Sequence, residues 1–228
     1  MISLDQHKDA LNQTGIELFD LCKKQLTNSR KAFFTHDNDL AEEVIYTENR
    51  VNALNLKIDR DCERFIALHK PVASDLRFVL ALRKINFDLE RVGDHAYGIS
   101  NYTVEIDIPI AKNLLEDLRM EEMFGTAISM LEDITGAYTS TDTIKARKVF
   151  KKDKSLNKIN KQAFKVISEG VKQDPNLIDQ YLLLFSVIKK IERIGDQITN
   201  IAEEIIFYRE SEVLKHIKRK GSLKNTAE

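Results

Sequence analysis

Two short motifs in this sequence carry pairs of carboxylates at a spacing that could bind a cation. Leu89-Glu-Arg-Val-Gly-Asp94 recurs as Ile191-Glu-Arg-Ile-Gly-Asp196. On a helix, residues four apart share one face, so each Glu–Asp pair would lie side by side and repel by roughly 0.2–0.5 kcal/mol. The glycine within each motif costs a helix about 0.5–1 kcal/mol relative to alanine. Because both unfavourable choices recur at matched positions, they indicate a functional or close-packing site.

A second pair of oxygen-bearing residues accompanies each motif at a similar offset. Glu48 and Asn52 precede the first motif, and Asp153 and Asn157 precede the second. If neighbouring helices are antiparallel, each pair can converge with its motif at a surface groove, with Glu48, Asn52, Glu90 and Asp94 outside the core. Oxygen ligands suit magnesium, calcium, manganese or iron better than zinc. The candidate metal ligands are Glu48, Asn52, Glu90, Asp94, Asp153, Asn157, Glu192 and Asp196.

A plainer interpretation of the same residues remains open. Arg91 and Arg193 directly follow the two glutamates and could pair with acidic residues on other helices. The acids would then form only salt bridges on a solvated face. His95 follows Asp94, but its counterpart in the second motif is Gln197, so we expect His95 to be an ordinary surface residue.

The pattern of apolar residues predicts that long helices carry these motifs. Ile85, Leu89, Val92, Ala96 and Ile99 follow steps of three and four, as do Ile191, Ile194, Ile198, Ile201 and Ile205. Asp37 and its neighbours are expected to cap the second helix, Asp174 the sixth, and Gly170 to end the fifth. Six helices are predicted at residues 3–34, 38–69, 72–103, 112–140, 142–170 and 175–209.

Composition narrows the class of protein. The 228 residues include only 8 Gly and 3 Pro, which favours long helices, and the net charge of −1 argues against nucleic-acid binding. Cys22 and Cys62 form no Cys-x-x-Cys pair, so neither a zinc site nor a redox motif is indicated. The N-terminus is too polar for a signal peptide, and no apolar run approaches the roughly 20 residues of a membrane span. We therefore expect a cytoplasmic protein.

The repeat defines the predicted organisation. The two motifs lie in two units of about a hundred residues with the same order of features. We predict an all-α fold of six long helices, in which two three-helix bundles occupy residues 1–106 and 107–210. Residues 211–228 form a basic tail that we expect to be flexible, and contact of this tail with an acidic partner or a membrane surface is an open alternative.

The sequence resembles the PhoU family over roughly residues 5–210. The resemblance rests on Pro71-Val-Ala-Ser-Asp-Leu-Arg77, Leu89-Glu-Arg-Val-Gly-Asp-His-Ala96, Ile191-Glu-Arg-Ile-Gly-Asp196 and Asn200-Ile-Ala-Glu203. It implies two bundles related by a pseudo-twofold, with multinuclear metal clusters at the paired acidic motifs, for which iron, manganese, magnesium or zinc are candidates. Asn52 and Asn157 depart from the family pattern, where aspartate is common, so each site would carry one charge fewer.

The resemblance also implies a role and partners. Members of this family restrain phosphate-starvation signalling by contacting a sensor histidine kinase and the ATPase of a phosphate ABC transporter. This chain would then be a non-enzymatic helical adaptor that reaches the membrane only through its partners. Because dimers are the commonest assembly of such helical proteins, we also expect a homodimer.

Two other functions stay open. A carboxylate-rich bundle could have an enzymatic or metal-handling role, although such bundles usually use Glu-x-x-His motifs on inward faces, and no histidine here has a Glu three residues before it. The chain could also be a scaffold whose acidic motifs only form salt bridges.

Overall fold

The structure is a computed structural model that describes residues 3–106, 109–211 and 214. Its helices are α1 (Leu4–Thr35), α2 (Asn38–His69), α3 (Ala73–Glu105), α4 (Lys112–Asp117), α5 (Met120–Ser140), α6 (Thr143–Gln173) and α7 (Ile178–Glu210), with a 3₁₀ turn, η1 (Pro175–Leu177), before α7. The described residues contain no strand, which confirms the all-α prediction.

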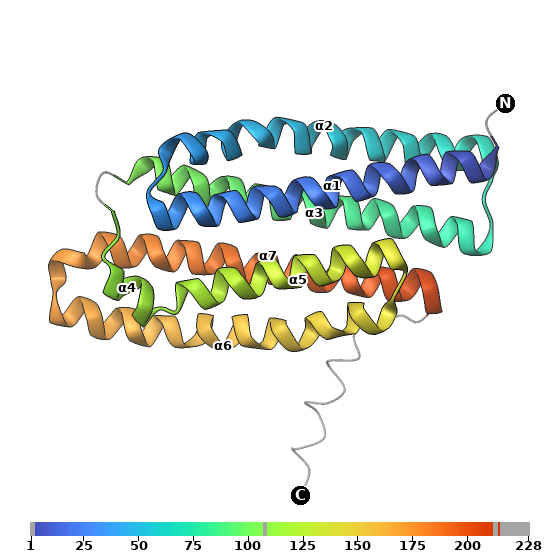
Figure 1. The fold of residues 1–228 in the computed structure, drawn as a ribbon. Coiled ribbons are helices and arrows are strands. Elements are labelled where there is room, and N and C mark those ends of the chain that lie inside the picture. Colours follow the sequence, from blue (N-terminus) through green and yellow to red (C-terminus); the bar gives the residue numbers. More distant parts are fainter. Residues whose placement is uncertain (1–2, 107–108, 212–213, 215–228) are drawn as a thin grey trace, which may run out of the picture.

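The helices form two three-helix bundles that lie side by side along their length (Figure 1). Helices α1, α2 and α3 make the first bundle, and α5, α6 and α7 make the second, with α4 at one end. Between the bundles, α3 packs against its repeat equivalent α7, and α1 packs against its equivalent α5. Contact between equivalent helices is the pattern expected of a pseudo-twofold, so the predicted pair of bundles is confirmed.

The apolar stripes predicted from the sequence form the core. Ile85, Leu89 and Ile99 of α3 and all five isoleucines of the α7 stripe are at most 2% exposed. Burying one such side chain contributes about 1.5–3 kcal/mol to folding, so the stripes dominate the stability of the bundles. Among the described residues, no helix is long and apolar enough to cross a bilayer.

The helix ends differ from the predictions in three places. Asp37 caps α2 as predicted, because its side chain accepts a hydrogen bond from the backbone N–H of Leu40. Gly170 does not end its helix: α6 continues to Gln173, and the Gly170 carbonyl accepts a hydrogen bond from the backbone of Asp174. Asp174 caps a 3₁₀ turn, which then leads into α7.

The helix predicted at 72–103 is confirmed to within two residues, because α3 spans Ala73–Glu105 and Pro71 precedes it. The third difference concerns the helix predicted at 112–140. The fourth predicted helix is two helices, because Arg119 adopts a left-handed backbone conformation with φ of 53° between α4 and α5. Nothing in the side-chain periodicity signals this break, which lets the chain turn from α4 into the bundle.

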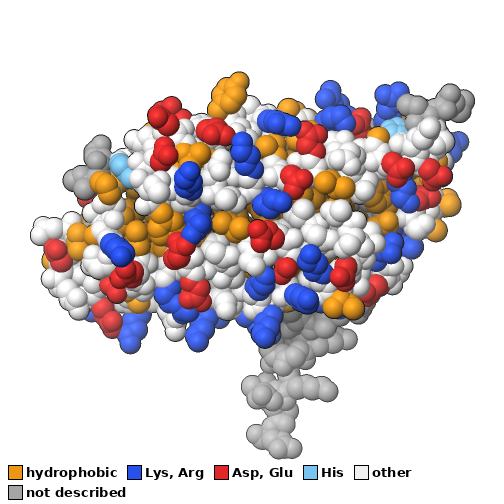
Figure 2. All heavy atoms as spheres, in the orientation of Figure 1, with side chains coloured by type: hydrophobic (Ala, Val, Ile, Leu, Met, Phe, Trp, Pro, Cys, Tyr) orange, Lys and Arg blue, Asp and Glu red, His pale blue; other side chains and the backbone are white. Residues whose placement is uncertain are grey.

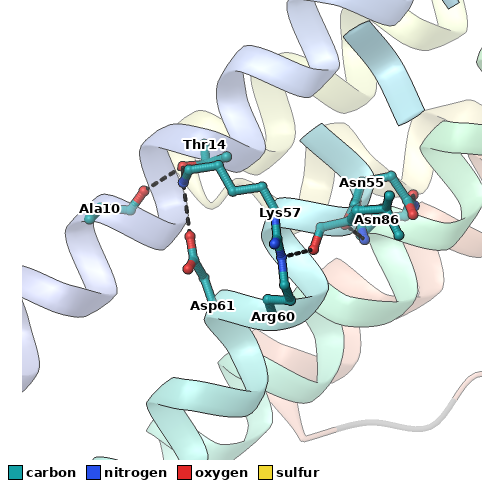
Figure 3. A network of polar contacts seen from close by, with 8 residues as sticks. Ala10, Thr14, Asn55, Lys57, Arg60, Asp61 and Asn86 are labelled. Atoms are coloured by element: carbon teal, nitrogen blue, oxygen red, sulfur yellow. Dashed lines mark hydrogen bonds and ion pairs between the residues drawn. The ribbon is translucent and has the colours of Figure 1, made fainter. Parts of the chain in front are cut away.

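Polar contacts fix the register of the helices in the first bundle (Figure 3). The Lys57 ammonium donates hydrogen bonds to Thr14 Oγ1 at 3.1 Å and to Asp61 Oδ2 at 2.8 Å, which ties α2 to α1. Asn55 and Asn86 each donate a hydrogen bond to the other's backbone carbonyl, at 3.4 and 3.0 Å, which ties α2 to α3. Because each amide bonds the backbone of the other helix, this pair holds α2 and α3 at one relative height, with Glu48 near Gly93 of the first motif.

Candidate metal centre

Glu48 is the residue around which the first candidate site is built. It lies on α2 and is only 7% exposed, so the prediction that it faces outward is wrong. Its Oε2 accepts a hydrogen bond from Nε2 of Gln25 on α1 at 3.0 Å. The carboxylate therefore lies in the seam between α1, α2 and α3. Helix α1 covers this side chain, which α2 and α3 alone would leave on the surface.

Gly93 makes room for this arrangement on α3. A Cβ atom at Gly93 would lie 3.1 Å from Gln25 Oε1, 3.1 Å from Val51 Cγ1 and 3.2 Å from Glu48 Oε2. These contacts are tighter than ordinary van der Waals contacts, so a larger side chain would displace the carboxylate and the amide. The glycine of the repeated motif is thus a close-packing residue. Its recurrence had indicated either a functional site or a close-packing site.

Charge concentrates at the first site. Burial raises the pKa of Glu48 to about 7, and the nearby carboxylates of Asp94 and Glu90 push it in the same direction, whereas the hydrogen bond from Gln25 opposes the shift. The pKa of Glu90 is also raised, by burial first and then by Asp94, with Arg91 opposing. These mutual effects show that Glu48, Glu90 and Asp94 share one electrostatic environment.

The remaining ligand candidates of the first set are more exposed. Asp94 and Asn52 lie at the surface, and Glu90 is half-buried beside them on the α2–α3 side of the bundle. Glu48, Glu90 and Asp94 thus lie close enough to influence one another's charge, and their convergence on a metal-binding groove stays a prediction. Asn52 lies one turn from Glu48 on the exposed side of α2.

The second set repeats the positions but not the contacts. Asp153 on α6 is 6% exposed, and its Oδ2 accepts a hydrogen bond from Asn157 Nδ2 at 2.9 Å. A Cβ atom at Gly195 would lie 2.7 Å from Leu156 Cδ1 and 3.3 Å from Asp153 Oδ1, so this glycine also keeps the helices close. On α7, Glu192 is half-buried and Asp196 is exposed. In this set Asn157 already serves as a hydrogen-bond donor to the buried carboxylate.

The donor atoms of the first set suit a hard cation. Glu48 Oε1 and Gln25 Oε1 are buried acceptor oxygens without a hydrogen-bond donor among the described residues. A buried acceptor without a donor is costly, and a cation would satisfy it. Among the residues that the structure describes, however, no three His, Cys, Asp or Glu side chains are already arranged to hold a metal ion. The oxygens fit in kind, and the exposed Asp94 side chain and half-buried Glu90 would have to close over the ion.

Gln25 is the site residue that sequence reasoning missed. It is 1% exposed and lies on the buried face of α1, together with Leu18, Cys22 and Leu26. A long amide side chain inside a largely apolar stripe was the available signal. The second unit has Met130 at the position equivalent to Gln25, by the same sequence offset that relates the helix caps Asp37 and Asp142. Met130 is fully buried and offers no oxygen.

His95 and the cysteines complete the surroundings of the motif. The expectation of a surface histidine is wrong, because His95 is 9% exposed. Burial lowers its pKa to about 4, and the cations of Lys190, Arg193 and Arg91 add to the effect, so the ring is neutral at physiological pH. Cys22 and Cys62 are buried free thiols, and the Cys22 thiol donates a hydrogen bond to the Leu89 carbonyl at 3.3 Å.

Comparison with known proteins places this architecture in a family. The PhoU domain model matches the chain twice, at residues 16–103 and 120–205. The phosphate-specific transport system accessory protein PhoU homolog of Burkholderia sp. is 32% identical over 203 residues, which cover 89% of this chain and 86% of that protein. The phosphate-specific transport system accessory protein PhoU of Escherichia coli (strain K12) is 31% identical over 197 residues, covering 86% of this chain and 81% of the relative.

Solved structures agree with the fold. The crystal structure of PhoU from Pseudomonas aeruginosa superimposes with a TM-score of 0.84 at 24% identity, covering 92% of this chain and all of that one. The phosphate transport system regulatory protein PhoU from Streptococcus pneumoniae gives a TM-score of 0.80 at 27% identity, covering 93% and 99% of the two chains. Each match of the domain model spans one of the two bundles that carry the acidic motifs. The chain therefore belongs to the PhoU family and consists mainly of two PhoU domains.

Proposed function

We propose that this protein regulates phosphate uptake and restrains phosphate-starvation signalling, as a non-enzymatic adaptor between the ATPase of a phosphate ABC transporter and a sensor histidine kinase. Membership of the PhoU family over both bundles is the observation that carries the proposal. It is supported by relatives named as accessory proteins of the phosphate-specific transport system. The proposed working form is a cytoplasmic homodimer.

The architecture suits an adaptor for a physical reason. The two bundles are joined along α3 and α7, where Lys84 forms an ion pair of 3.1 Å with the buried Glu204 and Asn200 donates a hydrogen bond to Asp88 at 3.2 Å. Such a joint gives long, rigid faces on opposite sides of one body. Two partners could bind these faces at the same time, since neither would have to displace the other.

Co-purification tests this function directly. The full-length protein, expressed in its own host, is expected to co-purify with the transporter ATPase, the sensor kinase or both when phosphate is plentiful. An unrelated ABC-transporter ATPase from the same cells serves as the control for non-specific capture. Failure to recover either partner at high phosphate would contradict the adaptor proposal.

The proposed role of the acidic motifs is to bind a divalent cation. Glu48, Glu90 and Asp94 would hold it in the first bundle, where it would neutralise three clustered carboxylates and fasten α2 to α3. Asp153, Asn157, Glu192 and Asp196 would form the weaker site, because the Asn157 amide already donates to one oxygen of Asp153 and Met130 stands at the position equivalent to Gln25. This unequal pair of sites modifies the expectation of two similar clusters.

A further inference from the structure

Helix α6 carries a concentration of positive charge that the proposed function does not use. Its 31 residues include ten lysines and arginines and only two acidic residues, Asp153 and Glu169. Because the whole chain has a net charge of −1, the rest of the molecule is correspondingly acidic. The protein is therefore strongly polarised even though its net charge is close to zero.

Five of these lysines form one straight line, which we name the lysine ridge. Lys151, Lys154, Lys158, Lys161 and Lys165 follow steps of three and four, and all five are exposed. The buried residues Val149, Asp153, Leu156, Asn160 and Ala163 lie on the opposite side of the same helix. The ridge is thus the outermost line of α6, about 21 Å long at 1.5 Å per residue. Blue side chains follow this edge of the molecule, at the bottom of Figure 2.

The ridge is scarcely neutralised by its surroundings. Lys165 makes a loose pair of 3.8 Å with Glu169, and none of the other four ridge lysines forms an ion pair with a carboxylate among the described residues. By contrast, the neighbouring Lys152, which faces α5, is paired with Asp133 at 2.7 Å. The inward-facing cation is thus matched by an acid, whereas the outward-facing line is not.

A shallow hollow beside the ridge adds a second feature. Its volume is about 640 Å³, and its lining consists of Lys154, Lys158 and Lys161 together with the amides of Asn157 and Gln162. Ammonium and amide N–H groups are donors for phosphate oxygens. A hollow of this size and lining has room for an anionic phosphate headgroup.

We propose that the lysine ridge of α6 binds the surface of an anionic phospholipid bilayer. Lipid fits this surface better than protein does, because interfaces between proteins are depleted in lysine and centre on aromatic or apolar anchors. The ridge is convex and consists of lysines, and the exposed Phe164 lies beside the line of lysines rather than in it. A flat anionic surface can meet all five ammonium groups at once, and each lysine near such a surface adds about 1 kcal/mol of attraction.

This mode of binding differs from that of an amphipathic helix inserted into lipid. The buried face of α6 is occupied by the bundle core, and Ile144 and Phe164 are the exposed large apolar residues of this helix. The helix would therefore adsorb mainly through charge and leave readily at high salt. It also differs from the expectation that the protein reaches the membrane only through its partners. The proposal rests on α6 and does not depend on the regulatory function.

Flotation with lipid vesicles tests the proposal without any protein partner. The full-length protein is mixed with phosphatidylcholine vesicles that contain either no phosphatidylglycerol or about 30% of it. Three variants of equal net charge are compared with the unaltered protein. They are Lys154→Glu/Lys158→Glu/Lys161→Glu in the ridge, Lys31→Glu/Arg64→Glu/Lys70→Glu on exposed sites of the first bundle, and Lys215→Glu/Lys218→Glu/Lys220→Glu in the basic tail. Circular dichroism confirms that each variant is folded.

The expected result is binding to the phosphatidylglycerol vesicles only, released by salt. The ridge variant should bind at least about tenfold more weakly, whereas the first-bundle and tail variants should stay within about twofold of the unaltered protein. Equal losses in the ridge and first-bundle variants, or a loss confined to the tail variant, would overturn the proposal. Absence of vesicle binding would also overturn it, and loss of transporter-ATPase association in the ridge variant would then assign the ridge to an acidic protein instead.

Discussion

Replacing Gly93 by valine is expected to lower the free energy of unfolding by about 3 kcal/mol, because overpacking a filled interior forces side chains from their preferred rotamers. A Cβ atom at this position would already meet Gln25, Val51 and Glu48 at 3.1–3.2 Å, and valine adds two methyl groups to it. Val51 is fully buried and β-branched, so it has little freedom to move away. Denaturation by urea, followed by circular dichroism, measures the change.

Gly125 provides the matched control for this prediction. It lies within α5, and a Cβ atom there would meet nothing within 4 Å. Gly125→Ala should therefore raise the free energy of unfolding by about 0.5–1 kcal/mol, which is the intrinsic helix preference of alanine over glycine. If Gly93→Val left the free energy of unfolding unchanged or raised it, as Gly125→Ala should, Gly93 would not be a close-packing residue.

Replacing Glu48 by glutamine is expected to stabilise the metal-free protein above neutral pH. Burial and the nearby Asp94 and Glu90 raise the pKa of Glu48 from its usual value near 4.5 to about 7 in the folded state. The folded protein therefore binds the Glu48 proton more tightly than the unfolded chain does. Stability is lost as pH rises from about 4.5 through 7, and Glu48→Gln should remove this loss and gain about 2–3 kcal/mol at pH 8.

The pH dependence of this stabilisation distinguishes it from a general effect of removing a charge. Near pH 4 Glu48 is mostly protonated in both states, so the glutamine variant should match the unaltered protein there. Glu42→Gln, at an exposed position of the same helix, is the control and should shift stability by less than about 0.5 kcal/mol at either pH. Urea denaturation between pH 4 and 8, with a chelator present, gives the profile. A constant difference at all pH values would contradict the raised pKa.

The helical fold could be predicted from the sequence because its signals are local. The apolar steps of three and four fix which face of α3 and α7 is buried, and Asp37 caps α2 through its own side chain. The break at Arg119 could not be predicted in this way. Its left-handed backbone conformation has no local signal in the sequence, since neither glycine nor proline marks the position.

The candidate site was only partly predictable for a related reason. Spacing placed Glu90 and Asp94 on one face of a helix, and the structure brings Glu48 to the same region. The burial of Glu48 depends on α1, which covers the α2–α3 seam and supplies Gln25. Helical periodicity describes one element at a time, so it cannot tell a flank that faces solvent from one that a third helix covers.

The differences between the two units follow from single positions. Gln25 supplies a buried amide in the first bundle, where Met130 supplies none in the second, and Asn157 donates to Asp153 where Asn52 stays exposed. The first set consequently brings two residues with buried acceptor oxygens together, Glu48 and Gln25. This asymmetry is the reason to expect cation binding mainly at the first bundle.

Calorimetric titration of chelator-treated protein with Mn²⁺ tests whether the first bundle holds the stronger cation site. We expect binding that is at least about tenfold weaker in Glu90→Gln/Asp94→Asn, because an uncharged amide is a poorer ligand for a hard cation than a carboxylate. The matched variant of the second bundle, Glu192→Gln/Asp196→Asn, should retain the tighter binding event. Absence of binding in the unaltered protein, or equal losses in both variants, would contradict an unequal pair of cation sites at the repeated motifs.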